Sequence, residues 1–236
     1  MSTAADPKEQ DMTVFGSAYA GVRKRVGELV LSLDAEDLDK RVPACPDWTI
    51  KDLVSHMTGI AADMIAGNVA EAGQDDWTNA QIAARKDRSI QEVVDEWNEV
   101  GSQLEAALEY LHPAVGALTV GDVVTHEHDA RQALGRPGAR DSDAIVIGLD
   151  IYVRRFGRRI RDEGLPTLEV KTESRTLRAG KDEPVGAVGG SDFELLRALT
   201  GRRTVEQIKV LDWTVNSEPY LGVFSSYDVP DQEIDE

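Results

Sequence analysis

Two stretches, TIKDLVSHMTG at residues 49–59 and GDVVTHEHDARQALG at residues 121–135, both have the apolar spacing of an amphipathic helix. The first contains His56, and the second contains Asp122 and His126. A carboxylate and an imidazole four residues apart lie on one helix face, and an imidazole from a neighbouring helix would complete a facial site for a divalent metal ion. The sequence therefore predicts a site as well as a fold.

Working outward from these stretches, the apolar spacing and the helix-end signals predict five helices. They run from about Met12 to Leu33, Thr49 to Ala66, Ser89 to Leu111, Thr119 to Gly135 and Asp143 to Glu163. Pairs that resemble capping boxes, Thr49 with Asp52 and Thr119 with Asp122, mark two of the starts. Long helices with turn-rich connections favour an up-and-down four-helix bundle. The connection of residues 67–88 is long for a passive link, so we expect it to hold a short helix or a lid over the site.

After Pro166 the pattern changes from helical to alternating. Residues 168–171 (LEVK) and 174–179 (SRTLRA) alternate as strands do, and Ser191 with Glu194 then predicts a short helix. The whole chain is predicted to be mainly α. It would comprise a disordered tail over residues 1–11, a metal-binding helical bundle over 12–164 and a small α+β domain over 165–236, which docks on the bundle because its own core is thin.

Composition and charge limit the partners that we expect. The net charge of −17 disfavours a general affinity for nucleic acid or for an anionic membrane. No apolar run approaches the ~20 residues of a membrane span, and the first residues lack the apolar core of a signal peptide. The single cysteine, Cys45, excludes an internal disulfide and fits a reducing compartment. We therefore expect a cytoplasmic monomer or homodimer without nucleic-acid or membrane partners.

One run, RRFGRRIR at residues 154–161, is locally basic. Its arginines spread around the predicted helix, so most of them must meet solvent or acidic neighbours. Ion pairs with the chain's many carboxylates account for them more simply than phosphate contacts do. DNA-binding regulation is therefore disfavoured.

Helical geometry separates the candidate ligands from the other polar residues. At 100° per residue, Asp122, His126 and Asp129 cluster roughly 90° from the apolar stripe of their helix, on a flank. His56 sits about 80° from the stripe of its own helix. By the same geometry His128 falls on the solvent side and is a poor ligand candidate. Two histidines on matching flanks could meet across a groove of the bundle.

The spacing alone leaves other interpretations open. A carboxylate and a histidine four residues apart are more often a surface ion pair, and Asp122 could serve only to cap its helix. A lone His56 would more often be a hydrogen-bonded groove residue. If a metal does bind, zinc is the ion we expect, although nickel, iron and manganese accept the same ligands. Asp129, one turn beyond His126, could then accept a hydrogen bond from the imidazole and orient it.

Three segments together resemble a known family, that of mycothiol-dependent maleylpyruvate isomerases, whose N-terminal part is similar to the DinB-like metal-binding bundles. The segments are VPACPDWTIKDLVSHMTG at residues 42–59, THEHDARQALGRPGARDSD at 125–143 and FELLRALTGRRTVEQI at 193–208. The specificity comes from the CPDWT-x-x-D-L-x-x-H block and the H-x-x-D block, in this order and at this separation. The resemblance covers nearly the whole chain, from Phe15 to Tyr227.

The resemblance implies a bundle that holds a divalent metal, normally zinc, through His56, Asp122 and His126. In the family this ligand can be glutamate, whereas this chain has Asp122, whose shorter side chain reaches about one methylene less far. Glu127 is the substitute if Asp122 is only a cap, although its helical position favours it less.

The resemblance also implies a cofactor and a second part of the site. Family members use mycothiol, whose sulfur would occupy the open metal position as a thiolate, because a cation lowers a thiol pKa. The thiolate would add to a small electrophile, and isomerisation or S-conjugation would follow. A sterol-carrier-like C-terminal domain closes the site in the isomerase and supplies an arginine. Arg202 is the candidate here for a clamp on a carboxylate or on the thiol cofactor, unless it is an ordinary surface charge.

Two functions therefore compete. The first is a metal-dependent, mycothiol-dependent isomerase or S-transferase acting on a small electrophile. The alternative is a non-catalytic metal-binding, thiol-binding or carrier module with the same fold, because function depends on the site rather than on the fold.

Overall fold

The computed structural model describes residues 13–234 and 236, and it is mainly helical with a small sheet, which confirms the predicted fold class. The long helices are α1 (Thr13–Leu31), α3 (Ile50–Ala66), α5 (Ile90–Leu108), α6 (Pro113–Ala133) and α7 (Asp143–Asp162). The shorter helices are α2 (Ala35–Leu38), α4 (Asp75–Ala83), α8 (Asp192–Leu199), α9 (Val205–Lys209) and α10 (Glu218–Phe224). The predicted disordered tail, residues 1–11, lies outside the described residues.

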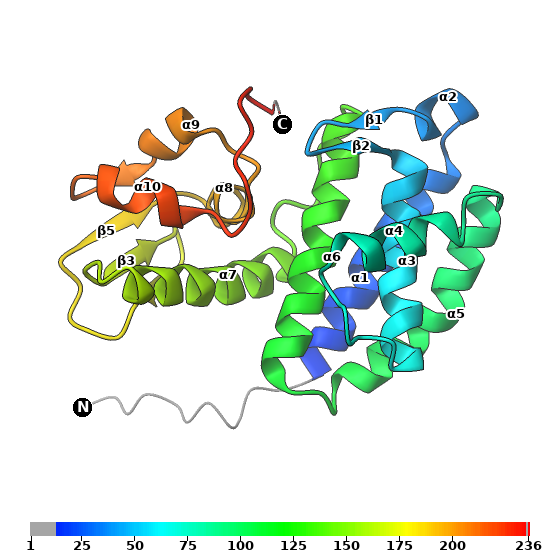
Figure 1. The fold of residues 1–236 in the computed structure, drawn as a ribbon, viewed down its shortest axis with the longest axis horizontal. Helices are drawn as coiled ribbons and strands as arrows, with labels where there is room; N and C mark the ends of the chain where they lie inside the picture. The colour runs from blue at the N-terminus through cyan, green and yellow to red at the C-terminus, as the bar shows by residue number, and fades with distance from the viewer. Residues whose placement is uncertain (1–12, 235) are drawn as a thin grey trace.

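The long helices α1, α3, α5 and α6 pack side by side in one part of the molecule, each against two of the others (Figure 1). Their apolar stripes meet in a core that includes Phe15, Leu53, Trp97 and Val124, all at most 1% exposed. Burying each such side chain contributes about 1.5–3 kcal/mol. Within this core, the indole N–H of Trp97 donates to the hydroxyl of Tyr19 at 2.8 Å.

The helix starts show which sequence signals were reliable. Thr49 caps α3 with Asp52 in a reciprocal capping box, as predicted. Helix α6, however, begins at Pro113 and not at Thr119, and His112 caps it by accepting a hydrogen bond from the backbone N–H of Ala114. Proline suits the first position of a helix because its missing N–H would have no partner there. Asp122 therefore lies inside α6, and its predicted capping role is wrong.

The long connection between α3 and α5 contains a helix, α4, which packs against α3. The contact is close at Gly59 of α3, where an added Cβ would overlap the side chain of Gln81. Glycine at this position therefore lets α4 approach closely enough to place Gln81 over the middle of α3.

The second part of the molecule contains a sheet and the helices α8, α9 and α10 (Figure 1). The strands β3 (Leu168–Lys171), β4 (Thr176–Ala179), β5 (Gly186–Gly189) and β6 (Asp212–Trp213) form a sheet in the order β4-β3-β5-β6, in which only β3 and β5 are parallel. A separate hairpin, β1 (Arg41–Val42) with β2 (Cys45–Thr49), leads into α3. Helices α8 and α10 pack against α7.

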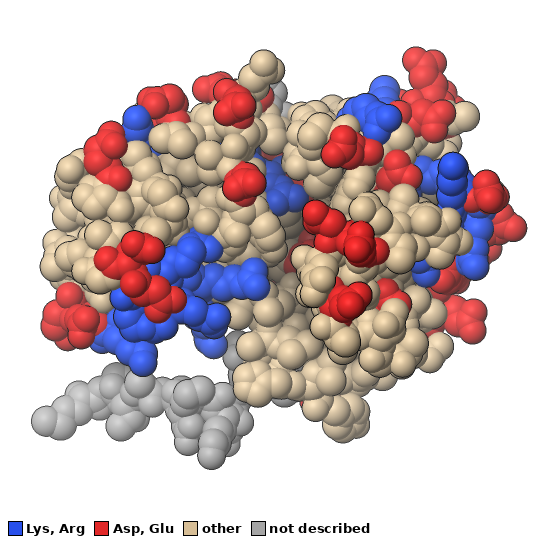
Figure 2. Space-filling model, viewed as in Figure 1, with Lys and Arg blue, Asp and Glu red and all other residues tan. Residues whose placement is uncertain are grey.

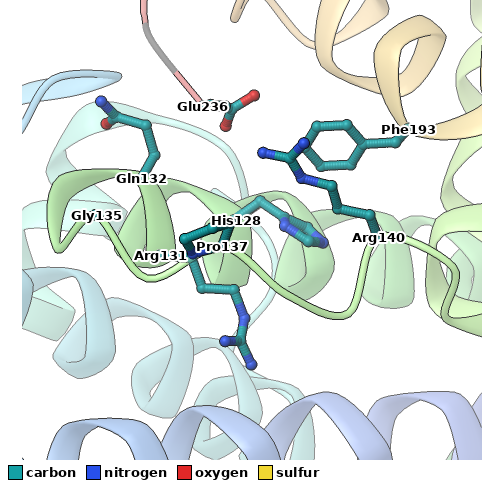
Figure 3. Close-up of a pocket in the computed structure, with 8 residues that line it drawn as sticks. All are labelled: His128, Arg131, Gln132, Gly135, Pro137, Arg140, Phe193 and Glu236. Atoms are coloured by element: carbon teal, nitrogen blue, oxygen red, sulfur yellow. The ribbon is translucent and has the colours of Figure 1, made fainter.

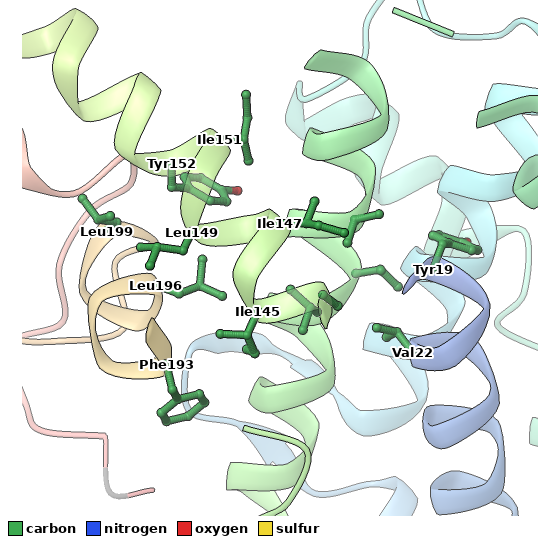
Figure 4. Close-up of a cluster of buried hydrophobic side chains, with 14 of the residues drawn as sticks. Tyr19, Val22, Ile145, Ile147, Leu149, Ile151, Tyr152, Phe193, Leu196 and Leu199 are labelled. Atoms are coloured by element: carbon green, nitrogen blue, oxygen red, sulfur yellow. The ribbon is translucent and has the colours of Figure 1, made fainter. Parts of the chain in front are cut away.

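Helix α7 joins the two parts. It crosses α6 closely where Gly148 faces Gly121, since a Cβ on Gly148 would lie 3.3 Å from the Cα of Gly121. Figure 4 shows its apolar side chains between Phe193 and Leu196 of α8 on one side and α1 on the other, so the core is continuous. Because α7 contacts both parts, the domain boundary at residues 164 and 165 stays a prediction.

The basic run at residues 154–161 lies on α7, and Figure 2 shows Lys and Arg side chains gathered over this helix. Arg159 donates to the carbonyl groups of Val223 and Phe224 rather than to a carboxylate. Arg161 is the member of this run that forms an ion pair, with Asp162, among the described residues. Ion pairing thus accounts for less of this run than the sequence predicted. None of the helices that residues 13–234 form has the length and apolarity needed to span a bilayer.

Candidate metal centre

The structure brings together the three residues that the sequence singled out. His56 on α3 and Asp122 and His126 on α6 each place one candidate ligand atom within 4.8 Å of the others. The Nε2 of His126 lies 3.7 Å from Oδ1 of Asp122, and the centroids of the two imidazole rings are 5.3 Å apart. Two ligands of one tetrahedral zinc ion lie ~3.4 Å apart. Only small side-chain movements therefore separate this geometry from a coordinating one, although metal binding itself stays a prediction.

His56 is oriented by a chain of neutral and acidic groups from α3 and α4. The amide Nε2 of Gln81 donates to Asp63 at 2.6 Å, which turns its Oε1 toward His56, 2.9 Å from Nδ1. The Nδ1–H of His56 therefore donates to Gln81, and Nε2 is left as the ligand atom. Burial, and then the positive charge of His126, lower the pKa of His56 to about 4. The ring is thus neutral, as a metal ligand must be.

His126 is oriented by a carboxylate instead. Its Nδ1 lies 3.0 Å from Oδ2 of Asp129, so Nε2 faces Asp122. Burial alone would lower the pKa of His126, but Asp122, Asp129 and the thiol of Cys45 outweigh it and raise the pKa to about 10. The surroundings of this ring therefore favour a positive charge next to Asp122. A divalent ion would supply that charge, so both the donor set and its electrostatics fit a divalent cation.

Asp129 connects the site to the second part of the molecule. Its carboxylate is fully buried and accepts hydrogen bonds from Nη1 of Arg197 at 2.8 Å and from Nη2 of Arg202 at 2.7 Å. Burial alone would raise the pKa of Asp129, but Arg202 and Arg197 outweigh it and hold this pKa well below its usual range. Asp129 is therefore a permanent anion that can orient His126, the position that the sequence suggested for it.

Arg202 is not a surface charge, because only 8% of it is exposed. Its Nε and Nη2 donate to Asp129, its Nη1 donates to the carbonyl of Thr200, and Nη2 lies 4.0 Å from the Sγ of Cys45. Each nitrogen of the guanidinium thus has a protein partner. The predicted role of Arg202 as a clamp on a substrate or cofactor stays a prediction.

Two other polar residues of α6 face elsewhere. Glu127 is fully buried, and Arg25 and Arg131 hold its carboxylate at 2.8 and 2.9 Å, which leaves Asp122 as the carboxylate beside the two imidazoles. His128, expected on the solvent side, is only 3% exposed and packs on the ring of Phe193. That expectation was wrong because α8 covers this face of α6.

Three residues of the site were missed by the sequence analysis. Trp48, in the CPDWT block, lies over both imidazoles, with ring centroids 4.9 Å from His56 and 6.0 Å from His126. Arg197 had a detectable signal, since it is a charge within the apolar run FELLRAL. Gln81 had none, because its role depends on how α4 packs on α3.

Comparison with known proteins agrees with this architecture. Residues 19–141, just over half of the chain, match the family described as the mycothiol maleylpyruvate isomerase N-terminal domain. A crystal structure of the mycothiol-dependent maleylpyruvate isomerase is similar with a TM-score of 0.62, and a histidine-to-alanine mutant of the isomerase with 0.59. Each is 12% identical, and the alignment covers 96% of this chain and 99% of the other. At this identity the likeness shows the fold alone. No curated protein matches the sequence.

Proposed function

Because the chain belongs to the family of the mycothiol maleylpyruvate isomerase N-terminal domain, we propose that it is a metal-dependent and mycothiol-dependent isomerase or S-transferase. Its substrate would be a small electrophile, and zinc is the metal that the ligand set favours. The observation that carries the proposal is the convergence of His56, Asp122 and His126 within 4.8 Å. Two imidazoles and one carboxylate leave a coordination position open for an exogenous ligand.

The residues around the centre would prepare this position. Gln81 and Asp129 each occupy the Nδ1 of one imidazole, so both rings present Nε2 to the same point. Such partners orient the ligands and raise their basicity. Trp48 covers both rings and limits the access of water from its side. When bound, the divalent ion would lower the pKa of the mycothiol thiol and hold it as the thiolate nucleophile.

The second part of the molecule would contribute through Arg202. Its contacts with Asp129 support a role in fixing His126, and its Nη2 lies 4.0 Å from the Sγ of Cys45. The hydroxyl groups of Tyr152 and Tyr227 lie 3.2 Å apart, and the guanidinium of Arg202 lies 6.0 Å from the ring of Tyr227. This side of the site therefore offers hydrogen-bond donors to a polar substrate.

Metal analysis of the purified protein, combined with a mycothiol-dependent turnover assay on small electrophiles, tests the proposal. We expect about one zinc ion per chain, and we expect the substitution His56→Ala to remove both the metal and the activity. His112→Asn is the matched control, because it changes a histidine outside the site and keeps a capping side chain. An active protein without metal would contradict the proposal. Binding of mycothiol and metal without turnover would favour the non-catalytic alternative.

A further inference from the structure

A pocket of about 280 Å³ lies on the face of α6 opposite the candidate metal centre (Figure 3). It is bounded by the C-terminal end of α6, the loop that leads to α7, the first turn of α8 and the last residue of the chain. The residues that line it are His128, Arg131, Gln132, Gly135, Pro137, Arg140, Phe193 and Glu236. None of them belongs to the proposed metal centre or its hydrogen-bond partners.

Two polar atoms of these lining residues lack a partner. The Nε2 of His128 and the Oε1 of Gln132 are buried, and neither has a hydrogen-bond partner within the described residues. His128 is only 3% exposed. Leaving a buried polar atom unpaired costs about 1–3 kcal/mol, so native structures rarely do so without a ligand, ion or water at the site. The pocket therefore presents one imidazole nitrogen and one amide oxygen that a bound molecule would satisfy.

The charges of the pocket leave one arginine uncompensated. Arg131 is paired with Glu127, and the side chain of Glu236 bridges Arg197 and Arg203. Arg140, by contrast, forms no ion pair with any residue in the described part of the chain, and its guanidinium lies 4.6 Å from the ring centroid of Phe193. Figure 3 shows this guanidinium directed into the space between Glu236 and His128. A single unpaired cation beside an aromatic ring favours a small anion with an apolar body.

We propose that this pocket binds a small hydroxylated carboxylic acid. Its carboxylate would pair with Arg140 and accept a hydrogen bond from Nε2–H of His128. Its hydroxyl would donate to Oε1 of Gln132, and its apolar body would lie against Phe193. The volume of about 280 Å³ suits a small molecule, because it lies just below the range of about 300–1,000 Å³ that is typical of drug-sized ligand sites. The proposal goes beyond the proposed function, since the pocket uses the other face of α6.

The test is a binding titration followed by NMR with three related probes: mandelate, phenylacetate, which lacks the hydroxyl, and benzyl alcohol, which lacks the carboxylate. We expect mandelate to bind most tightly, phenylacetate more weakly and benzyl alcohol not at all. Arg140→Gln should weaken mandelate binding at least about tenfold. Gln132→Leu should remove the preference for mandelate over phenylacetate. Absence of saturable binding by all three probes would overturn the proposal.

The matched control is Arg136→Gln. Arg136 lies four residues before Arg140 on the same loop, but it contacts Ser32 and Asp37, outside the pocket. We expect this variant to bind mandelate like the unaltered protein, and equal losses in both variants would overturn the proposal. His56→Ala should also leave mandelate binding intact. Loss of binding in that variant would place the ligand at the metal centre instead.

Discussion

The two halves of the candidate metal centre hold their imidazoles in different ways. On the α3 side, the neutral amide of Gln81 holds His56, and both hydrogen bonds of the Gln81 side chain join residues of α3 and α4. On the α6 side, the anion Asp129 holds His126, and two buried arginines from the second part hold Asp129. The residues that orient His56 thus lie in the first part of the molecule, whereas the orientation of His126 also depends on arginines about 70 positions after Asp129 in the sequence.

This difference shows what each part of the chain supplies. The segment that matches the family, residues 19–141, contains His56, Gln81, His126 and Asp129, but neither arginine. A buried carboxylate without a counter-charge is strongly destabilising. The second part of the molecule therefore does more than cover the site, because it neutralises the group that orients one ligand.

The largest effect should come from Asp129→Asn. This change removes the one carboxylate that pairs with Arg202 among the described residues and one of the two that pair with Arg197, whose other partner is Glu236, so we expect a loss of about 3–5 kcal/mol in the free energy of unfolding. Metal affinity should fall by about 10–100-fold, because the amide orients His126 less firmly. Urea denaturation and competition with a zinc chelator measure the two effects. Asp63→Asn on the other half is the control and should cost less than about 1 kcal/mol. Equal losses in both variants would refute the contrast between the halves.

Removal of the metal should come next in size. At a free zinc concentration one hundred times the dissociation constant, binding stabilises the folded state by about 2.7 kcal/mol. We therefore expect a chelator to lower the melting temperature of the unaltered protein and to leave that of His56→Ala unchanged. Thermal unfolding with and without the chelator measures this. An identical shift in both proteins would mean that the metal binds elsewhere.

Gln81→Leu tests the neutral half alone. The change removes the acceptor for Nδ1–H of His56 but leaves no buried charge unpaired, so we expect a loss in metal affinity of about tenfold or more and a smaller loss of stability than Asp129→Asn causes. Chelator competition measures the loss of metal affinity, and urea denaturation measures the loss of stability. Comparison of both losses with those of Asp129→Asn distinguishes the two halves of the centre. A stability loss as large as that of Asp129→Asn would contradict this account.

The smallest effect is expected for Gly59→Ala. The added methyl group would displace Gln81, and overpacking of this kind costs about 1–3 kcal/mol. Because α4 is short and can shift, we expect metal affinity to fall by only about threefold, less than Gln81→Leu should cause. Gly222→Ala is the control, since a Cβ there meets no atom within 4 Å. Unchanged zinc affinity in Gly59→Ala would show that the position of α4 does not matter for the centre.

Sequence reasoning found the parts of this site that depend on local spacing. The helical periodicity and the capping box of Thr49 located α3, and the four-residue interval between Asp122 and His126 identified two side chains that do lie together. Both features follow from the geometry of a single helix, so they need no knowledge of the tertiary structure.

Other features could not be obtained in this way. The sequence analysis ended one helix at Leu111 and began the next at Thr119, whereas α6 begins at Pro113, since proline is unfavourable inside a helix but favourable at its first turn. The solvent-facing position assigned to His128 assumed that the bundle alone covers α6, but α8 packs there as well. The burial of Arg202 likewise depends on a partner, Asp129, that lies 73 residues earlier.

The pairing of Asp129 with two arginines restricts how the chain can be recombined with its relatives. A chimera that took its last 70 or so residues from another protein of this fold would need cationic side chains at the positions of Arg197 and Arg202. Without them, residue 129 would have to change to a neutral side chain in the same step. We therefore expect residues 129, 197 and 202 to be compatible only when all three are taken from the same protein.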